Sequence, residues 1–186
     1  MKTISLLGYA LLGLLHQKER SGYDLRKIFA GTPMGTFSDS PGAIYPALHR
    51  LEKQGLVRGQ SQPSSGRRRR TFRVTTSGKR SFKAWQTKAI SQDDVIHRVD
   101  ELMLRFGFMD ETADPDHARR FLTSLMRELR RYTPSLRQYL KANARYMPLS
   151  GRLALESGVR DYEELLRWSR SSLARYTNRK KGARRT

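Results

Sequence analysis

The stretch GAIYPALHRLEKQGLV, residues 42–57, decides the fold of the first half of this chain. Its apolar residues recur at helical spacing, at Ile44, Leu48 and Leu51. Gly55 follows as a helix stop signal, and Ser40 and Pro41 supply an N-cap and a first-turn residue. Pro46 interrupts the pattern, because proline removes a backbone donor at a cost of about 3 kcal/mol in a helix interior. A helix that begins near Pro41 keeps Pro46 close to its N-terminus, where the first turn can adjust.

A helical wheel divides this segment into two faces. One face is apolar: Ile44, Ala47, Leu48 and Leu51. The other is basic and polar, with Tyr45 on its flank: Gly42, Pro46, His49, Arg50 and Lys53. A basic face of this kind suits the recognition helix of a helix-turn-helix, where Arg and Lys reach guanine acceptors in the major groove. A solvated helix face is the alternative interpretation of the same pattern.

The segments before and after this helix predict the rest of a DNA-binding domain. Residues 3–16 predict a helix that is buried on most sides, and Ser21 is a good N-cap for a second helix. After Gly55, two alternating segments flank the turn-forming QPSSG and predict a two-stranded hairpin with Phe72 and Val74 inside. Thr75 can cap a further helix. Three helices followed by a hairpin are the order of a winged helix-turn-helix.

Four consecutive arginines, Arg67, Arg68, Arg69 and Arg70, lie at the predicted hairpin turn. Neighbouring like charges repel one another, and a polyanion would neutralise them. We therefore predict that this wing, together with Ser40, holds the nucleic-acid backbone, while Tyr45, Pro46, His49, Arg50 and Lys53 form the face turned toward the bases. A solubilising loop is the alternative for the arginines.

The second half predicts packed helices. A helix is expected over residues 93–108, and two heptad seams follow. The first seam runs from Ala118 to Tyr139 and the second from Leu155 to Tyr176. We predict that these seams form a dimer interface, with these residues at its centre: Leu122, Leu125, Leu129, Tyr132, Val159, Tyr162, Leu166, Leu173 and Tyr176.

The fold expected is therefore mainly α with a small β-hairpin: an N-terminal winged helix-turn-helix and a C-terminal antiparallel, coiled-coil-like helical domain. The expected boundaries are 1–88 for the DNA-binding domain, 93–178 for the dimerisation domain and 179–186 for a basic flexible tail.

Charge supports this division. The 186 residues have a formal net charge of +20. Residues 1–88 contain 17 Lys and Arg against 4 Asp and Glu, whereas residues 89–178 contain 15 against 13. The first half therefore carries the preference for a polyanion, nucleic acid before an anionic membrane.

The sequence offers no catalytic motif. It has no cysteine, its four histidines lack ligand spacing, and it contains no phosphate loop, nucleophile elbow or zinc-protease motif. We expect no enzyme activity, no cofactor and no metal, and a cytoplasmic location. The apolar residues 4–15 are expected to be a buried helix rather than a secretion signal, because no small-residue cleavage site follows them.

The combination of LLGYALLGLL, SGYDLRKIF, SPGAIYPALHRLEKQGLV and GRRRRTFRVTTSGKRSF resembles the PadR family of bacterial transcriptional regulators. The Tyr-Pro pair and the Leu-x-Arg-Leu-Glu-x-x-Gly stretch of that family match these positions: Tyr45, Pro46, Leu48, Arg50, Leu51, Glu52 and Gly55. The resemblance is specific up to about residue 85. Beyond it, the likeness is to the architecture of longer members with a helical dimerisation domain.

The resemblance implies a homodimer that binds a pseudo-palindromic operator in double-stranded DNA, usually as a repressor. In some members of the family, binding of a small aromatic or hydrophobic effector releases the protein from the operator. Trp85 is the candidate effector residue. Two other functions fit the same basic surface: an RNA-binding or ribosome-associated protein, and an interaction module that binds no nucleic acid.

Overall fold

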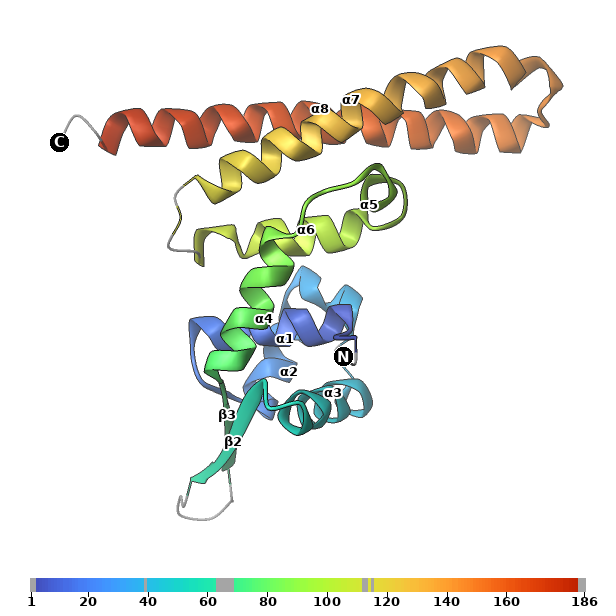
Figure 1. Cartoon of the computed structure of the whole chain (residues 1–186). Helices are drawn as coiled ribbons and strands as arrows, with labels where there is room; N and C mark the ends of the chain where they lie inside the picture. The colour runs from blue at the N-terminus through green and yellow to red at the C-terminus, as the bar shows by residue number, and fades with distance from the viewer. Residues whose placement is uncertain (1–2, 39, 63–68, 112–113, 115, 184–186) are drawn as a thin grey trace. The chain divides into compact units, whose positions relative to one another are not determined.

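The computed structural model describes residues 3–38, 40–62, 69–111, 114 and 116–183, and the chain divides into two compact units, Met1–Gln86 and Thr87–Thr186 (Figure 1). Each unit has its own helices and its own buried residues. Within the described ranges, no helix is both long enough and apolar enough to cross a membrane.

The first unit is built on four helices: α1 (Leu6–Gln17), α2 (Gly22–Gly31), α3 (Pro41–Lys53) and α4 (Thr76–Thr87). A short 3-10 turn, η1 (Pro33–Phe37), interrupts the loop between α2 and α3. Ser21 caps α2 as expected, and its side chain forms a capping box with Asp24. Thr75 accepts a hydrogen bond from the Gly78 amide at 3.0 Å, which caps α4. The helix starts expected from the sequence at Ser21 and Thr75 are confirmed.

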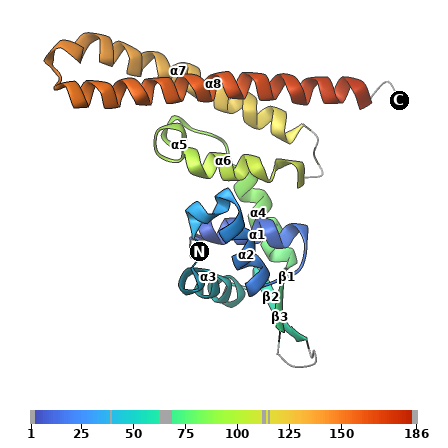
Figure 2. The same cartoon turned by 180° about the vertical axis from the view of Figure 1, so that it is seen from behind.

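The sheet has three antiparallel strands in the order β1-β3-β2: β1 (Arg20–Ser21), β2 (Val57–Gln62) and β3 (Arg69–Val74) (Figure 2). The predicted hairpin is the β2–β3 pair, and Phe72 is buried as expected. The third strand is absent from the sequence prediction. Two residues are too few to show an alternating pattern, and β1 exists because Arg20 pairs with Phe72 of β3.

Helix α3 continues through Pro46 and ends in a left-handed turn. Gly55 has φ +70°, a conformation that glycine adopts without steric cost. The Leu56 amide donates to the carbonyl of Leu51 at 2.9 Å, and the Gly55 amide donates to that of Glu52 at 2.9 Å. These two bonds form a Schellman motif, which confirms Gly55 as the stop signal.

The core of the first unit forms where α1, α2, α3 and α4 meet. These side chains are at most 3% exposed: Leu11, Leu12, Leu25, Phe29, Ile44, Leu48, Leu51 and Phe82. Trp85 is also buried, and its ring stacks on Tyr9 with 4.3 Å between the centroids. Trp85 therefore already has an aromatic partner within its own unit, and its effector role stays a prediction.

The second unit contains α5 (Gln92–His97), α6 (Val99–Gly107), η2 (Met109–Glu111), α7 (His117–Asn143), η3 (Ala144–Tyr146) and α8 (Leu149–Ala183). The single helix expected over 93–108 is wrong, because the chain leaves helical geometry at Arg98, where φ is −139° and ψ is 34°. The guanidinium of Arg98 bonds to Asp94 at 2.8 Å and to Asp93 at 2.7 Å. These bonds hold the break between α5 and α6.

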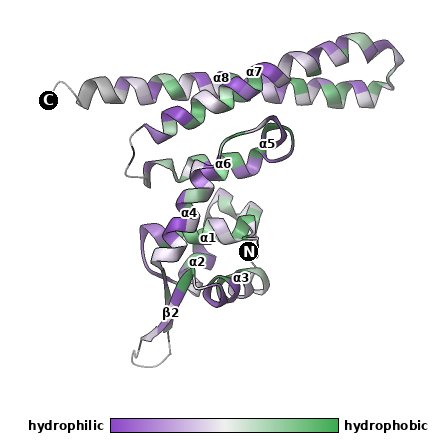
Figure 3. Ribbon diagram, in the orientation of Figure 1, coloured by the Kyte–Doolittle hydropathy of each residue, from purple (hydrophilic) through white to green (hydrophobic). Residues whose placement is uncertain are grey.

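Helices α7 and α8 lie side by side and run in opposite directions, with hydrophilic and hydrophobic residues mixed along both (Figures 1 and 3). Helix α8 continues to Ala183, beyond residue 179 where the basic tail was expected to begin, and the flexibility of that tail stays a prediction. Pro134 lies inside α7 and is exposed, opposite the seam.

The heptad seams pack inside one chain. Leu122, Leu125 and Leu129 have 0% exposure, and Tyr162, Leu166, Leu173 and Tyr176 pack against the cluster that they form. The dimer interface predicted for the three leucines is therefore corrected. Periodicity shows that a face is apolar, and here α8 of the same chain covers it.

Two buried charged groups organise the start of the second unit. The Asp94 carboxylate caps α5 through Ser91 and lies near Lys88 and Arg98. Burial alone would raise the pKa of Asp94, but the Ser91 hydrogen bonds and the two cations outweigh it and lower the pKa. Arg105, only 2% exposed, donates to the carbonyl of Lys88, and its guanidinium lies 5.3 Å from the Phe121 ring centroid. Burial lowers the pKa of Arg105.

Candidate nucleic-acid interface

The exposed side of α3 carries the predicted contact residues. Ser40 caps the helix by accepting a hydrogen bond from the Gly42 amide at 3.2 Å. His49, Arg50 and Lys53 are exposed, and none of them forms an ion pair or hydrogen bond with a described side chain. The opposite side of α3 is buried in the core at Ile44, Ala47, Leu48 and Leu51. This burial fixes which face of the helix is presented, so the three basic or ionisable side chains are free to meet a partner.

Pro46 lies on the same exposed side of α3. It removes the donor that would otherwise reach the carbonyl of Gly42, within the first two turns of the helix. Because the core contacts of α3 come from the other face, the missing bond leaves the packing of Ile44 and Leu48 intact.

Tyr45 is held by the neighbouring helix of the motif. Its side chain is 46% exposed, and its ring lies against Gly22 at the start of α2. A Cβ added at Gly22 would lie 2.4 Å from the Tyr45 ring, so a side chain at this position would displace the ring. Gly22 therefore positions a predicted base-contacting residue, a role that residue spacing along the sequence does not reveal.

The wing is joined to α3 through Glu52. The Glu52 carboxylate accepts a hydrogen bond from the Gly59 amide at 2.8 Å and forms an ion pair with Arg70 at 2.8 Å. The Arg70 guanidinium also lies 5.3 Å from the Phe72 ring centroid. Arg70, predicted to hold phosphates, thus binds within its own domain and orients β3 against α3. Glu52 matched the family pattern, but its partner is separated from it by 18 residues and became visible only in the structure.

The structure describes only part of the other wing arginines. Arg69 begins β3, but its side chain lies outside the described residues, as do Arg67 and Arg68 altogether. Their predicted phosphate contacts stay predictions.

Two arginines of the strands were missed by the sequence analysis. Arg58 of β2 pairs with Arg73 of β3 in the strand register, and both are exposed. Paired residues in an antiparallel sheet project from the same face, and like charges in such a pair destabilise it. Neither has an ion-pair partner among the described side chains. The alternation of apolar and polar residues along β2 and β3 could have identified them, because the correct strand register places the two arginines opposite each other.

Residues 11–84 match the family model described as "Transcriptional regulator PadR-like family". The chain carries a PadR-like domain. The matched region begins within α1 and ends within α4, and so contains α2, α3 and the wing. The fold expected from the sequence, a winged helix-turn-helix followed by a helical region, is confirmed.

Two curated relatives and one solved structure illustrate the similarity. The negative transcriptional regulator PadR of Bacillus subtilis is 25% identical over 146 residues, which cover 78% of this chain and 79% of that protein. Transcriptional regulator Rv3488 of Mycobacterium tuberculosis is 48% identical over 40 residues, 22% of this chain and 37% of that protein. The crystal structure of Bacillus subtilis PadR with operator DNA is 24% identical, covers 92% of this chain and 99% of its own, and has a TM-score of 0.44.

The PadR-like domain brings most of the predicted site residues together on α3. Within the described part of the chain, no group of three or more His, Cys, Asp or Glu side chains is arranged to hold a metal ion. The exposed side chains of Tyr45, Arg50 and Lys53 make the outer face of α3 basic and aromatic, chemistry that suits phosphates and base edges.

Proposed function

We propose that this chain is a sequence-specific DNA-binding transcriptional regulator, a repressor that binds a pseudo-palindromic operator as a homodimer. The observation that carries the proposal is the exposed face of α3, where His49, Arg50 and Lys53 stand without ionic partners beside an apolar face that is fully buried. A helix held in this way has the geometry with which helix-turn-helix domains read the major groove.

The wing supports the same proposal. The opposed Arg58 and Arg73 repel each other in the free protein, and phosphate groups would remove that repulsion. The match of residues 11–84 to a family of transcriptional regulators agrees with this chemistry. The similarity to a negative regulator over most of the chain supports repression as its output.

Dimerisation is the part of the proposal that determines the symmetry and the half-site spacing of the operator. Two copies related by two-fold symmetry would present their α3 helices to half-sites about 34 Å apart, one helical turn of DNA. Because Leu122, Leu125 and Leu129 are buried within the chain, we assign contact between copies to predicted interface residues that remain partly exposed: Tyr132, Leu166, Leu173 and Tyr176. Release of the operator by a small hydrophobic or aromatic effector completes the proposed cycle.

The test is a footprint of the full chain on the DNA upstream of its own coding sequence, repeated at two salt concentrations and with competitors. We expect a protected site with two-fold symmetry that survives an excess of unrelated duplex and RNA. If each binding unit contacts about six phosphates, the logarithm of affinity should fall with the logarithm of salt at a slope near −5.

Other outcomes reject parts of the proposal. If RNA competes as well as operator duplex, the protein is an RNA-binding protein. If nucleic acid binds without any steep salt dependence, or does not bind, the winged helix is a protein-interaction module. A monomer that protects a single half-site in the footprint, and sediments as a monomer, rejects the dimer alone.

A further inference from the structure

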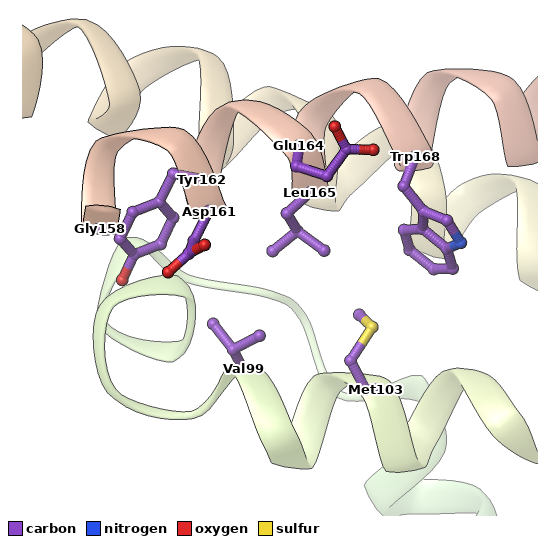
Figure 4. Close-up of a pocket in the computed structure, with 8 residues that line it drawn as sticks. All are labelled: Val99, Met103, Gly158, Asp161, Tyr162, Glu164, Leu165 and Trp168. Atoms are coloured by element: carbon purple, nitrogen blue, oxygen red, sulfur yellow. The ribbon is translucent and has the colours of Figure 1, made fainter. Parts of the chain in front are cut away.

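A groove in the second unit lies between α6 and α8 (Figure 4). Its volume is about 610 Å³, within the range of pockets that hold small organic ligands. Val99 and Met103 of α6 point toward Leu165 and Trp168 of α8 across the groove (Figure 4). The walls are therefore apolar and come from two helices of one compact unit.

Trp168 gives the groove a rigid aromatic end. Its ring meets Phe106 edge to face, with 5.0 Å between centroids and 83° between the ring planes. Trp168 remains partly exposed although it packs against the core of the unit. A ligand in the groove would therefore meet a tryptophan whose orientation is already fixed by its neighbour.

Three polar side chains line the groove, two carboxylates and one phenol, and two of the three form hydrogen bonds or ion pairs within the chain. The Tyr162 hydroxyl donates to the carbonyls of Val95 and Ile96 at 3.3 and 3.4 Å. Glu164 is paired with the guanidinium of Arg167, whose Nε lies 2.9 Å from its carboxylate. Asp161 has neither an ion pair nor a hydrogen bond from any described side chain.

The isolated carboxylate stands out against the charge of the chain. The net charge is +20, and on α8 the neighbouring acids Glu156, Glu163 and Glu164 each have an arginine partner. An exposed carboxylate beside an apolar groove therefore leaves a local negative charge on a protein that otherwise attracts anions. A cation with a bulky apolar body satisfies both features at once.

We propose that the groove between α6 and α8 binds a hydrophobic organic cation, whose apolar body lies between Met103 and Trp168 and whose positive charge lies beside Asp161. This inference deepens the proposed function, because it names the location and the chemical class of the effector. The aromatic face of Trp168 adds cation–π attraction to the contribution of Asp161.

The test titrates the full chain, without DNA, with tetraphenylphosphonium and with tetraphenylborate, two ions of nearly the same shape and opposite charge. In a Trp85→Phe variant, the remaining tryptophan fluorescence comes from Trp168. We expect saturable quenching by the phosphonium at concentrations at least threefold lower than by the borate. The net charge of the chain favours the borate everywhere else, so a preference for the cation requires a local acidic site.

A matched pair of variants locates the charge. We expect Asp161→Asn to weaken phosphonium binding about three- to tenfold, the range of an exposed charge contact. Asp100→Asn removes the same charge from α6 at an exposed residue that does not line the groove, and it should leave the affinity unchanged. Calorimetry on the unmodified chain measures the same binding if Trp85→Phe fails to fold.

Four results overturn the proposal: equal or tighter binding of the borate, no saturable binding of the phosphonium, equal affinity after Asp161→Asn, or Trp168 emission that depends on protein concentration and ignores the phosphonium. The last result would mean that a second copy of the chain covers the groove. The operator footprint is measured separately, so a failed titration with an intact footprint rejects this site and leaves the proposed DNA-binding function standing.

Discussion

Helix α3, the proposed recognition helix, and the long helix α8 differ in how their exposed basic side chains are paired. On α3, Arg50 and Lys53 are exposed and have no ionic partner among the described residues. On α8, Arg160 and Arg167 are just as exposed, yet each lies beside a glutamate of its own helix. Both helices are amphipathic, so their apolar faces alone do not distinguish a recognition surface from a structural one.

This difference indicates which part of the surface a polyanion would neutralise. Surface ion pairs contribute little to stability, about 0 to 1 kcal/mol each, but they cancel the local field. In the second unit several arginines are paired in this way, among them Arg137, Arg160 and Arg167, whereas Arg50, Lys53 and the Arg58–Arg73 pair have no acidic partner among the described side chains. Unpaired basic side chains are therefore gathered on the exposed face of α3 and on the wing, where the DNA surface is proposed.

The largest expected effect concerns a charge that is buried instead of presented. Arg105→Ala removes the donor to the Lys88 carbonyl and the packing on Phe121. We expect the free energy of unfolding to fall by about 2–4 kcal/mol, measured by urea denaturation. Arg130→Ala, at an exposed arginine of α7, should change it by less than about 0.5 kcal/mol. Similar losses for both variants would contradict a structural role for burial at Arg105.

Arg50→Ala tests the presented charge. We expect operator affinity to fall about 5- to 150-fold, which corresponds to 1–3 kcal/mol for a base contact, while the stability of the protein stays unchanged. Fluorescence anisotropy with operator and with unrelated duplex separates lost selectivity from lost attraction. Arg130→Ala is again the control, because it removes the same net charge from the second unit. Equal losses for the two variants would show that only net charge matters.

Gly22→Ala tests how α2 positions the recognition face. The added methyl group would displace the exposed Tyr45 ring, and we expect a loss of about 1 kcal/mol in the free energy of unfolding. In a Tyr45→Ala background the same substitution should cost much less, since the collision is gone. Gly31→Ala, where a Cβ meets nothing within 4 Å, should not destabilise the protein. An additive double variant would rule out the proposed contact.

Asp94→Asn tests the buried acid of the second unit through pH. The pKa of Asp94 is lowered in the folded chain, so its charge stabilises the fold above the unfolded pKa of about 3.9, and that stabilisation is lost as the pH falls through the folded pKa. We expect wild type to exceed the variant by about 1 kcal/mol between pH 5 and 8 and to lose this advantage below pH 4. A difference that is constant down to pH 2 would refute the assignment.

The smallest expected effect concerns the opposed arginines of the wing. Arg73→Gln should raise the free energy of unfolding by a few tenths of a kcal/mol, because it removes like-charge repulsion from Arg58. It should also reduce the salt slope of DNA binding by about one. Adding Arg58→Gln should then stabilise the protein less than it does alone. A salt slope that does not change would remove both arginines from the interface.

Local chemistry explains which features were predictable. The caps at Ser21, Ser40 and Thr75 and the stop at Gly55 depend on a few adjacent residues, and all four occur as expected. The break at Arg98 was missed because its apolar neighbours keep helical spacing on both sides of it, while the bonds from Arg98 to Asp93 and Asp94 favour the interruption.

The sequence by itself determined that α3 has a buried face and a basic face, because that division depends only on spacing along one helix. Tertiary structure decided which partners those faces meet. Glu52 forms an ion pair with Arg70, the Tyr45 ring packs against Gly22, and α8 covers the seam leucines of its own chain. The physical reason is that periodicity specifies an apolar or charged surface but not the element packed against it, which depends on contacts between residues far apart in the chain.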